Sequence, residues 1–173
     1  MGGGRDQTER EVMLWVADTG PVLHLAEAGA LHLLPLLGEV VLPPAVQEEL
    51  LRLQAGPPDA LNVRPLTPFS TTQADDWCKA GLVDRGEAQA IALARQTGAD
   101  YFLTDDAAAR LLATTLGLRA RGSLGVVLWL TGQKQIPQAE AENYLEKLAG
   151  TSLWVSPRIM AEARAALKMM VQP

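Results

Sequence analysis

Apolar and polar residues alternate along the chain in short blocks that have the lengths of strands and helices. The continuous apolar run at residues 12–17, which ends at Asp18, predicts a strand buried on both faces. Similar runs predict strands at residues 39–42 and 100–104. The weaker runs at residues 61–66 and 118–122 are consistent with short or edge strands.

The segments between these runs have the periodicity and the termini of helices. Pro44 suits the first turn of a helix, and Thr97-Gly98 suits the end of one. Gly56-Pro57-Pro58 should interrupt the helix that precedes it. Helices are expected at residues 22–28, 30–37, 45–53, 71–80, 84–96, 107–116, 123–130, 139–148 and 158–170.

Strands that alternate with helices at this spacing predict an α/β fold with a parallel sheet covered on both faces. We expect one domain over residues 12–173, because the chain has no repeat, no low-complexity linker and no block of charge. Residues 1–11 are polar and rich in glycine, and we expect a disordered tail there. The absence of a signal-peptide pattern or a long apolar run indicates a cytoplasmic protein that does not enter a membrane.

The composition excludes several kinds of site. Cys78 is the only cysteine, so neither an internal disulfide nor a thiolate zinc site can form. His24 and His32 are the only histidines, and we expect both on helix surfaces. The formal net charge of −5 argues against broad non-specific affinity for nucleic acid, although an acidic metal site would contribute to that charge.

Acidic residues follow two of the predicted buried strands. Asp18 ends the first strand, and Asp105 and Asp106 follow the strand at residues 100–104. Ligands of open parallel sheets bind beyond the carboxyl ends of the strands, so these carboxylates would converge if the two strands are neighbours. Glu49 and Glu87, which lie in predicted helices, are further candidates.

Carboxylates that converge repel one another unless a cation lies between them, which favours magnesium or manganese. Each residue also has a simpler explanation. Asp18 and the Asp105-Asp106 pair could cap helices, Glu49 could be a solvated helix charge, and Glu87 could interact with a helix dipole. The order and spacing of the whole set favour a metal site.

Four motifs in this order resemble those of the PIN domain family over roughly residues 12–130. The motifs are an apolar strand into Asp18-Thr-Gly-Pro, Pro-Pro-Ala-Val-Gln-Glu-Glu49-Leu, Asp-Arg-Gly-Glu87-Ala, and Thr-Asp105-Asp106-Ala-Ala-Ala-Arg followed by Gly122-Ser-Leu-Gly125. The resemblance implies a three-layer α/β/α sandwich around a short parallel sheet. It also implies a metal-dependent endoribonuclease similar to the toxin subunits of toxin–antitoxin pairs, with Mg2+ or Mn2+ as the cofactor.

The resemblance further implies which residues form the site. The catalytic carboxylates would be Asp18, Glu49, Glu87, Asp105 and Asp106. For the last acidic position of the family, the Thr-x-Asp pattern favours Asp106, whereas the spacing from Glu87 slightly favours Asp105. All of these except Glu49 are candidate metal ligands. The implied partners are RNA, a possible antitoxin protein and a second copy of the chain in a homodimer.

Cationic and aromatic residues supply the candidates for substrate contacts. Arg85, Arg110 and Thr104 flank the acidic motifs, and guanidinium groups bind phosphate well, although a surface ion pair is the simpler interpretation of each arginine. Weaker candidates for an RNA-contacting rim are Lys79, Arg119 and Arg121. The four tryptophans, at positions 15, 77, 129 and 154, are expected to be packing residues rather than platforms for bases.

Two other functions are compatible with this sequence. A non-catalytic module could use the same fold to bind a protein or RNA, and the intact set of acidic residues argues against it. A phosphatase that forms an aspartyl-phosphate would want a second aspartate two residues after Asp18, where this chain has Gly20. The metal-dependent ribonuclease is therefore the leading hypothesis.

Overall fold

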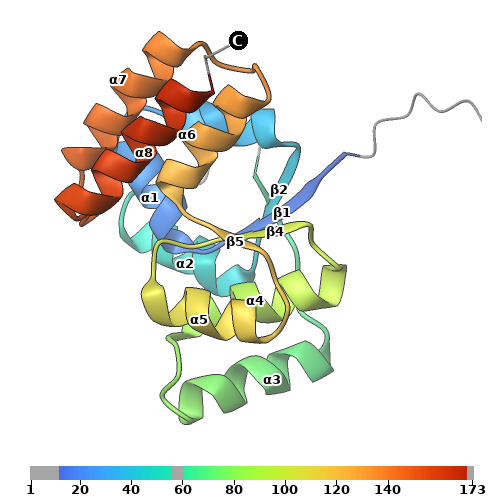
Figure 1. Ribbon diagram of the computed structural model, residues 1–173. Coiled ribbons are helices and arrows are strands. Elements are labelled where there is room, and N and C mark those ends of the chain that lie inside the picture. The colour runs from blue at the N-terminus through green and yellow to red at the C-terminus, as the bar shows by residue number, and fades with distance from the viewer. Residues whose placement is uncertain (1–11, 56–60, 171–173) are drawn as a thin grey trace, which may run out of the picture.

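A five-stranded parallel sheet lies at the centre of the computed structural model, which describes residues 12–55 and 61–170 (Figure 1). All four strand pairs are parallel, and the order across the sheet is β3-β2-β1-β4-β5. The strands are β1 (Leu14–Ala17), β2 (Glu39–Leu42), β3 (Asn62–Val63), β4 (Tyr101–Leu103) and β5 (Ala120–Arg121).

The direction of the chain across the sheet reverses between β1 and β4. From β1 the chain moves outward to β2 and β3, then crosses to β4 and continues outward to β5. Ala17 pairs with Leu103 at the carboxyl ends of β1 and β4, and the backbone N–H of Asp18 donates to the carbonyl of Leu103 at 3.0 Å. Such a reversal opens a crevice at the carboxyl ends of the two strands, which is where ligands of this class of sheet bind.

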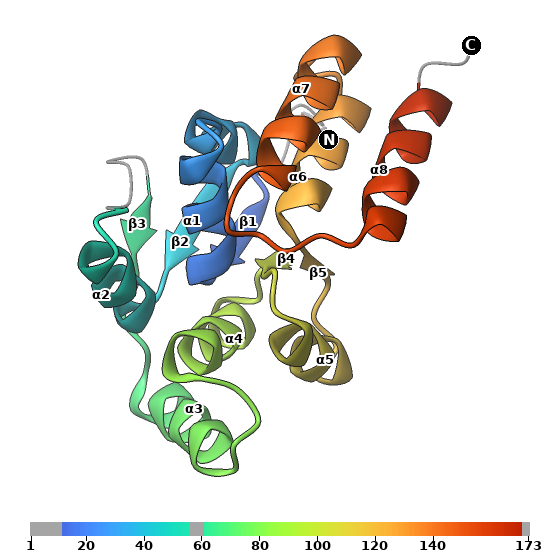
Figure 2. The same cartoon turned by 90° about the vertical axis from the view of Figure 1, so that its left-hand side faces the viewer.

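Helices cover both faces of the sheet and form the outer two layers (Figure 2). On one face lie α1, the 3-10 helix η1 and α6, with α7 and α8 outside them; α4 and α5 cover the other face, with α3 outside α4. Helix α2 contacts both α1 and α4. The bounds are α1 (Thr19–Glu27), η1 (Leu31–Leu37), α2 (Pro44–Arg52), α3 (Pro68–Lys79), α4 (Arg85–Thr97), α5 (Ala107–Thr115), α6 (Ser123–Gly132), α7 (Gln138–Ala149) and α8 (Pro157–Met169).

The main hydrophobic core extends from the sheet into the layer of α6, α7 and α8. Trp15 and Phe102, on the neighbouring strands β1 and β4, are completely buried. Trp15 stacks on Tyr101 at a centroid distance of 4.3 Å, and its indole N–H donates to the carbonyl of Leu37. The predicted packing role of Trp15 is therefore confirmed.

The structure confirms the predicted three-layer α/β/α fold, with local differences at three helices. The helix expected at residues 22–28 begins at Thr19, because Asp18 caps it by accepting from the N–H of Gly20. The helix expected at residues 30–37 is a 3-10 helix, and it contains Pro35, which has no N–H to donate. The helix expected to begin near Thr71 begins at Pro68, because Thr67 caps it by accepting from the N–H of Ser70.

Two further expectations meet the limits of the described residues. The tail predicted at residues 1–11 and the interruption predicted at Gly56-Pro57-Pro58 lie outside them. Within residues 12–55 and 61–170, none of the helices is both long and apolar enough to pass through a bilayer.

Candidate active site

Six carboxylates line one hollow at the carboxyl ends of β1 and β4. This acidic hollow has a volume of about 430 Å³. Its lining residues are Asp18, Thr19, Gly20, His24, Glu49, Asp84, Glu87, Asp105, Asp106, Leu153 and Trp154. The structure thus brings together all five of the acidic residues predicted from the sequence, and it adds Asp84. Within the described part of the chain, no lysine or arginine lines this hollow.

Three helices begin at the acidic hollow, and an aspartate caps each of them. Asp18 accepts from the N–H of Gly20 in α1, Asp84 from Glu87 in α4, and Asp106 from Ala109 in α5. The amino ends of helices carry partial positive charge, which favours carboxylates there. The capping roles considered for Asp18 and Asp106 are therefore real, and they bring the same carboxylates to the acidic hollow.

Asp18 is the most buried of these carboxylates, with 3% of its surface exposed. One oxygen accepts from the N–H of Gly20 at 2.9 Å and the other from the hydroxyl of Thr104 at 2.7 Å. Burial raises the pKa of Asp18 well above its usual value, the two hydrogen bonds act in the opposite direction, and the charges of Glu87 and Asp105 raise it further. A cation near Asp18 would favour the charged carboxylate.

Glu87 forms a capping box with Asp84 at the start of α4. The Glu87 carboxylate accepts from the N–H of Asp84, and the Asp84 carboxylate accepts from the N–H of Glu87, each at 2.9 Å. Burial raises the pKa of Glu87 to about 7, and the charges of Asp84, Asp106 and Glu49 add to this while the hydrogen bond from Asp84 opposes it. Glu87 is thus both a helix cap and part of the repulsive cluster.

The side chain of Glu49 extends from α2 into the acidic hollow and passes close to Gly86, where a larger residue would leave it no room. Its carboxylate accepts a short hydrogen bond from the hydroxyl of Thr19. A Cβ added to Gly86 would lie 2.5 Å from one Glu49 carboxylate oxygen and 2.7 Å from the other. The glycine of the Gly86-Glu87 motif therefore makes room for the carboxylate of Glu49.

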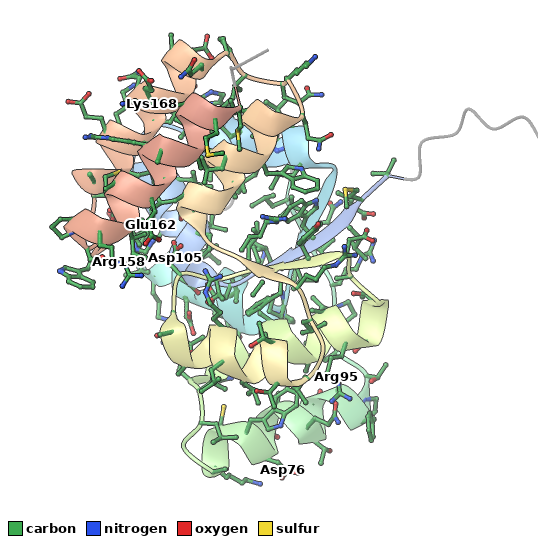
Figure 3. All side chains as sticks on the ribbon, viewed as in Figure 1. Asp76, Arg95, Asp105, Arg158, Glu162 and Lys168 are labelled. Atoms are coloured by element: carbon green, nitrogen blue, oxygen red, sulfur yellow. The ribbon has the colours of Figure 1, made fainter. Side chains whose placement is uncertain are left out.

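Asp105 is held by three donors, two of which belong to Ser123. Its Oδ1 accepts from the Ser123 N–H at 2.7 Å, and its Oδ2 accepts from the Ser123 hydroxyl at 2.5 Å and lies 2.7 Å from Nδ1 of His24. A Cβ added to Gly122 would lie 2.6 Å from Oδ1 of Asp105. The turn into α6 thus holds this carboxylate, which lies between α5 and α8 in the view of Figure 3.

Asp105 and Asp106 differ in what their oxygens already bind. Asp106 is exposed and uses Oδ1 to accept from Ala109 at 2.8 Å, and no protein donor within the described residues binds its Oδ2. Both oxygens of Asp105 have donors. Asp106 therefore has the more available oxygen, which agrees with the choice that the sequence motif favours.

The three predicted substrate contacts have different surroundings. Arg85 forms an exposed ion pair with Glu48 at 2.7 Å. Thr104 is completely buried, donates to Asp18 and accepts from the N–H of Asp106 at 3.1 Å, so its side chain positions the carboxylates and is not available to touch a substrate. Arg110 is exposed and donates only to two backbone carbonyls, those of Thr104 and Ala120, at 3.3 and 3.4 Å.

Arg110 lines a second hollow, of about 320 Å³, on the other side of Asp105. We call it the arginine hollow; its lining residues are Asp105, Arg110, Ala120, Arg121, Gly122, Leu124, Gly125, Leu153, Trp154, Val155, Ser156 and Ile159. Of the weaker rim candidates, only Arg121 is here. Arg119 packs its guanidinium over Tyr101 at 4.7 Å, and Lys79 lies at the end of α3.

Besides Asp84, sequence reasoning missed four residues that line the site or hold its carboxylates. His24 was expected on a helix surface, but its side chain is only 13% exposed and pairs with Asp105; His32, by contrast, is exposed as expected. Trp154 was expected to pack inside, but it is 84% exposed and lines both hollows. Ser123 and Thr19 each hold a carboxylate that is distant in the sequence, and only the Gly122-Ser123 and Asp18-Thr19 motifs pointed to them.

The acidic hollow fits a divalent cation by the chemistry of its donors. Among the described residues, no three carboxylate, imidazole or thiol groups are already arranged as a complete metal site. Magnesium does not need such a cage, because it is usually bound by one or two carboxylates and keeps several waters. The pKa values of Asp18 and Glu87 are raised mainly by burial and to a smaller extent by neighbouring carboxylates, and a hard cation beside them would favour their charged forms.

The comparison with protein families identifies the fold. A family model described as PIN domain matches residues 14–169. A comparison with curated proteins finds no match for this chain. The matched region includes every element of the sheet and both hollows, and the chain therefore belongs to the PIN domain family. PIN domains are generally nucleases and generally use divalent metals.

Proposed function

We propose that this PIN domain is an endoribonuclease that cleaves RNA phosphodiester bonds with Mg2+ or Mn2+ at the acidic hollow. The observation that supports the proposal most strongly is the convergence of five predicted carboxylates at the chain reversal between β1 and β4. A fold that used these residues only as helix caps would have no reason to place Glu49 there, because Glu49 caps no helix.

Asp18, Glu87 and Asp106 are the groups that would hold the cation. Asp18 is fixed by Thr104 and Gly20, and Glu87 is fixed by the capping box, so both carboxylates are oriented before any ligand binds. Asp106 lines the same hollow, and among the described residues no protein donor binds its Oδ2. When bound, such a cation lowers the pKa of a coordinated water and stabilises the leaving oxygen of the phosphodiester.

Glu49 and Asp105 contribute in other ways. Glu49, positioned by the hydroxyl of Thr19, is an acceptor for a proton of the attacking water. Asp105 lies between the two hollows, just after β4. Its contacts with Ser123 and His24 connect this end of β4 to α6 and α1. Its position there fixes Asp106, the next residue, without requiring that Asp105 itself touch the cation.

The proposed cleavage has a direct test. Purified protein is incubated with a panel of structured and single-stranded RNAs in magnesium, in manganese and in EDTA, and each reaction is repeated with Asp18→Asn. We expect cleavage only with a metal, and a loss of at least about 100-fold in Asp18→Asn. Equal cleavage by both proteins, or no cleavage of any RNA in either metal, would contradict the proposal and favour a binding module.

The cellular setting is part of the same proposal. Cytoplasmic RNA is the substrate that we propose, with the protein acting as the toxin of a pair whose antitoxin covers the site, and with a homodimer as the working form. A short open reading frame for a DNA-binding protein beside the gene would support the antitoxin. Growth arrest on expression of the wild type, but not of Asp18→Asn, would support the toxin.

A further inference from the structure

Trp154 is the most exposed large apolar side chain of the described residues, at 84%, and it lines both hollows. Burying a tryptophan side chain contributes strongly to folding, because it removes 150–250 Å² or so of surface from water. A tryptophan left in water beside two charged hollows gives up that contribution. Its position therefore points to a ligand rather than to the core.

The segment that presents Trp154 is fixed at both ends. Before it, Ser152 donates its N–H at 2.7 Å and its hydroxyl at 2.8 Å to the carboxylate of Glu27 at the end of α1. After it, Ser156 caps α8 by accepting from the N–H of Ile159. Leu153 and Val155, on either side of the tryptophan, pack against the core, so the backbone is held and the indole points outward.

The arginine hollow beside Trp154 is lined by the guanidinium-bearing residues Arg110 and Arg121 and by one carboxylate, that of Asp105. Within residues 12–55 and 61–170, Arg110 and Arg121 form no ion pair. Arg121 packs its guanidinium over Tyr101 and Trp129, at 4.8 Å from each ring, and its buried Nε has no hydrogen-bond partner. Arg110 donates only weakly, at 3.3 and 3.4 Å, to two backbone carbonyls. Because neither arginine is in an ion pair, a phosphate can bind them without first breaking a salt bridge.

We propose that Trp154 and the arginine hollow form a subsite for one nucleotide of single-stranded RNA next to the scissile bond. An unpaired base stacks on the indole of Trp154, and the phosphate that follows it binds Arg110 and Arg121. The scissile phosphate then lies in the acidic hollow, on the other side of Asp105. This subsite rests on the proposed ribonuclease function, and it specifies the substrate as single-stranded, because a base inside a duplex has no free face for the indole.

The charge of the two hollows favours RNA over a protein occupant. An RNA strand that passes from the arginine hollow to the acidic hollow would first contact Arg110 and Arg121. It would then reach the place where a divalent cation would bind. Both interactions neutralise consecutive phosphates, and the tryptophan between them binds an apolar base face. An apolar protein surface on Trp154 would leave the guanidiniums beside it without partners.

The test measures the affinity for a fluorescein-labelled single-stranded RNA of about 12 nucleotides by fluorescence anisotropy. The full chain is used in EDTA and in magnesium, and electrophoresis checks that the probe stays intact. We expect Trp154→Ala to weaken binding at least about fivefold and Trp154→Phe to retain most of it. A duplex of the same sequence should bind all variants equally and more weakly.

Phe69→Ala is the matched control. Phe69 is an aromatic residue of α3 that is 72% exposed, and it lines neither hollow. Its removal should leave RNA affinity unchanged. Bound RNA should also quench the tryptophan fluorescence of the wild type and of Phe69→Ala, and this quenching should be lost in Trp154→Ala.

Three results would overturn the subsite: wild-type affinity in Trp154→Ala, no RNA binding by the wild type in either buffer, or a dimer that dissociates in Trp154→Ala during sedimentation. The last would make Trp154 part of an interface between two copies.

The two proposals fail separately. Binding that depends on Trp154 without cleavage leaves the subsite and removes the ribonuclease, whereas cleavage that Trp154→Ala leaves unchanged removes only the subsite.

Discussion

The acidic hollow and the arginine hollow share Asp105, Leu153 and Trp154, but they are built from different kinds of structure. Five carboxylates of the acidic hollow lie at the end of a strand or in the first turn or cap of a helix, and Glu49 reaches it from α2. The arginine hollow combines Arg110 of α5 and Arg121 of the edge strand β5 with Trp154 from the irregular segment between α7 and α8. The proposed chemistry thus depends mainly on the termini of regular elements, whereas the proposed recognition combines a helix, an edge strand and a connection.

This difference implies that the two hollows can be damaged separately, except at the wall between them. Asp105 and the residues that hold it belong to both. Changes there should affect cleavage and RNA binding together, whereas changes near Glu49 should affect cleavage alone.

The largest effect is expected from Gly122→Ala, which alters the shared wall. The new methyl group would lie 2.6 Å from Oδ1 of Asp105 and 3.2 Å from the guanidinium of Arg110. Both side chains must move, and a displacement of this size typically costs about 100-fold in rate. Cleavage and RNA affinity should both fall. Gly132→Ala, where the methyl group would meet open space, is the control and should leave both unchanged.

Gly86→Ala should separate the two hollows. The three atoms nearest to its methyl group all belong to the flexible end of Glu49, so we expect the carboxylate to move while the fold stays. We expect cleavage to fall about 10- to 100-fold, with RNA affinity unchanged. Because alanine favours helices over glycine by about 1 kcal/mol, thermal stability should not fall. Wild-type cleavage by a folded Gly86→Ala protein would show that the position of Glu49 does not matter.

Ser123→Ala should have a smaller effect, which appears in stability as well as in cleavage. The buried hydroxyl of Ser123 donates to the Asp105 carboxylate, and hydrogen bonds to charged groups contribute about 1.5–3 kcal/mol. Chemical denaturation should show a loss of about this size, together with slower cleavage. Ser70→Ala removes a buried hydroxyl whose partner, Thr67, is neutral. It should cost less stability and leave cleavage unchanged.

The smallest effect that we expect is on the pH dependence of stability. It concerns only the acidic hollow, in the absence of metal. The pKa of Glu87 is about 7 in the folded protein and 4.5 ordinarily, so the folded state binds this proton more tightly. The stability from Glu87 is therefore complete below pH 4.5 and is lost as the pH rises to 7. In EDTA, the melting temperature of the wild type should fall over this range more than that of Glu87→Gln. Equal slopes in the two proteins would contradict the raised pKa of Glu87, which we attribute to burial first and to repulsion by neighbouring carboxylates second.

The sequence predicted the acidic hollow better than the arginine hollow for a physical reason. Asp18, Glu87 and Asp106 mark the ends of elements whose periodicity is visible in the sequence, and the parallel sheet then brings those ends together. No comparable feature of the sequence indicates the positions of Arg121 and Trp154. Their roles depend on where β5 and the segment after α7 pack, and this is decided by contacts between residues distant in the chain.

His24 illustrates the same limit within the acidic hollow. Its position on α1 follows from the sequence, but its partner Asp105 is 81 residues away. A histidine on a short helix looks like a surface residue until β4 is known to lie beside β1. The glycines at 86 and 122 were visible as parts of motifs, whereas the carboxylates that they leave room for were not.

The central claim is that the carboxylates of the acidic hollow meet to bind a divalent cation. Isothermal titration of the RNA-free protein with Mg2+ and Mn2+ tests it most directly, in the wild type, in Asp18→Asn and in Asp76→Asn, which removes an exposed carboxylate of α3. We predict saturable binding in the wild type and in Asp76→Asn, and a loss of at least about tenfold in affinity in Asp18→Asn. Equal affinity in all three proteins, or no binding by the wild type, would contradict the account.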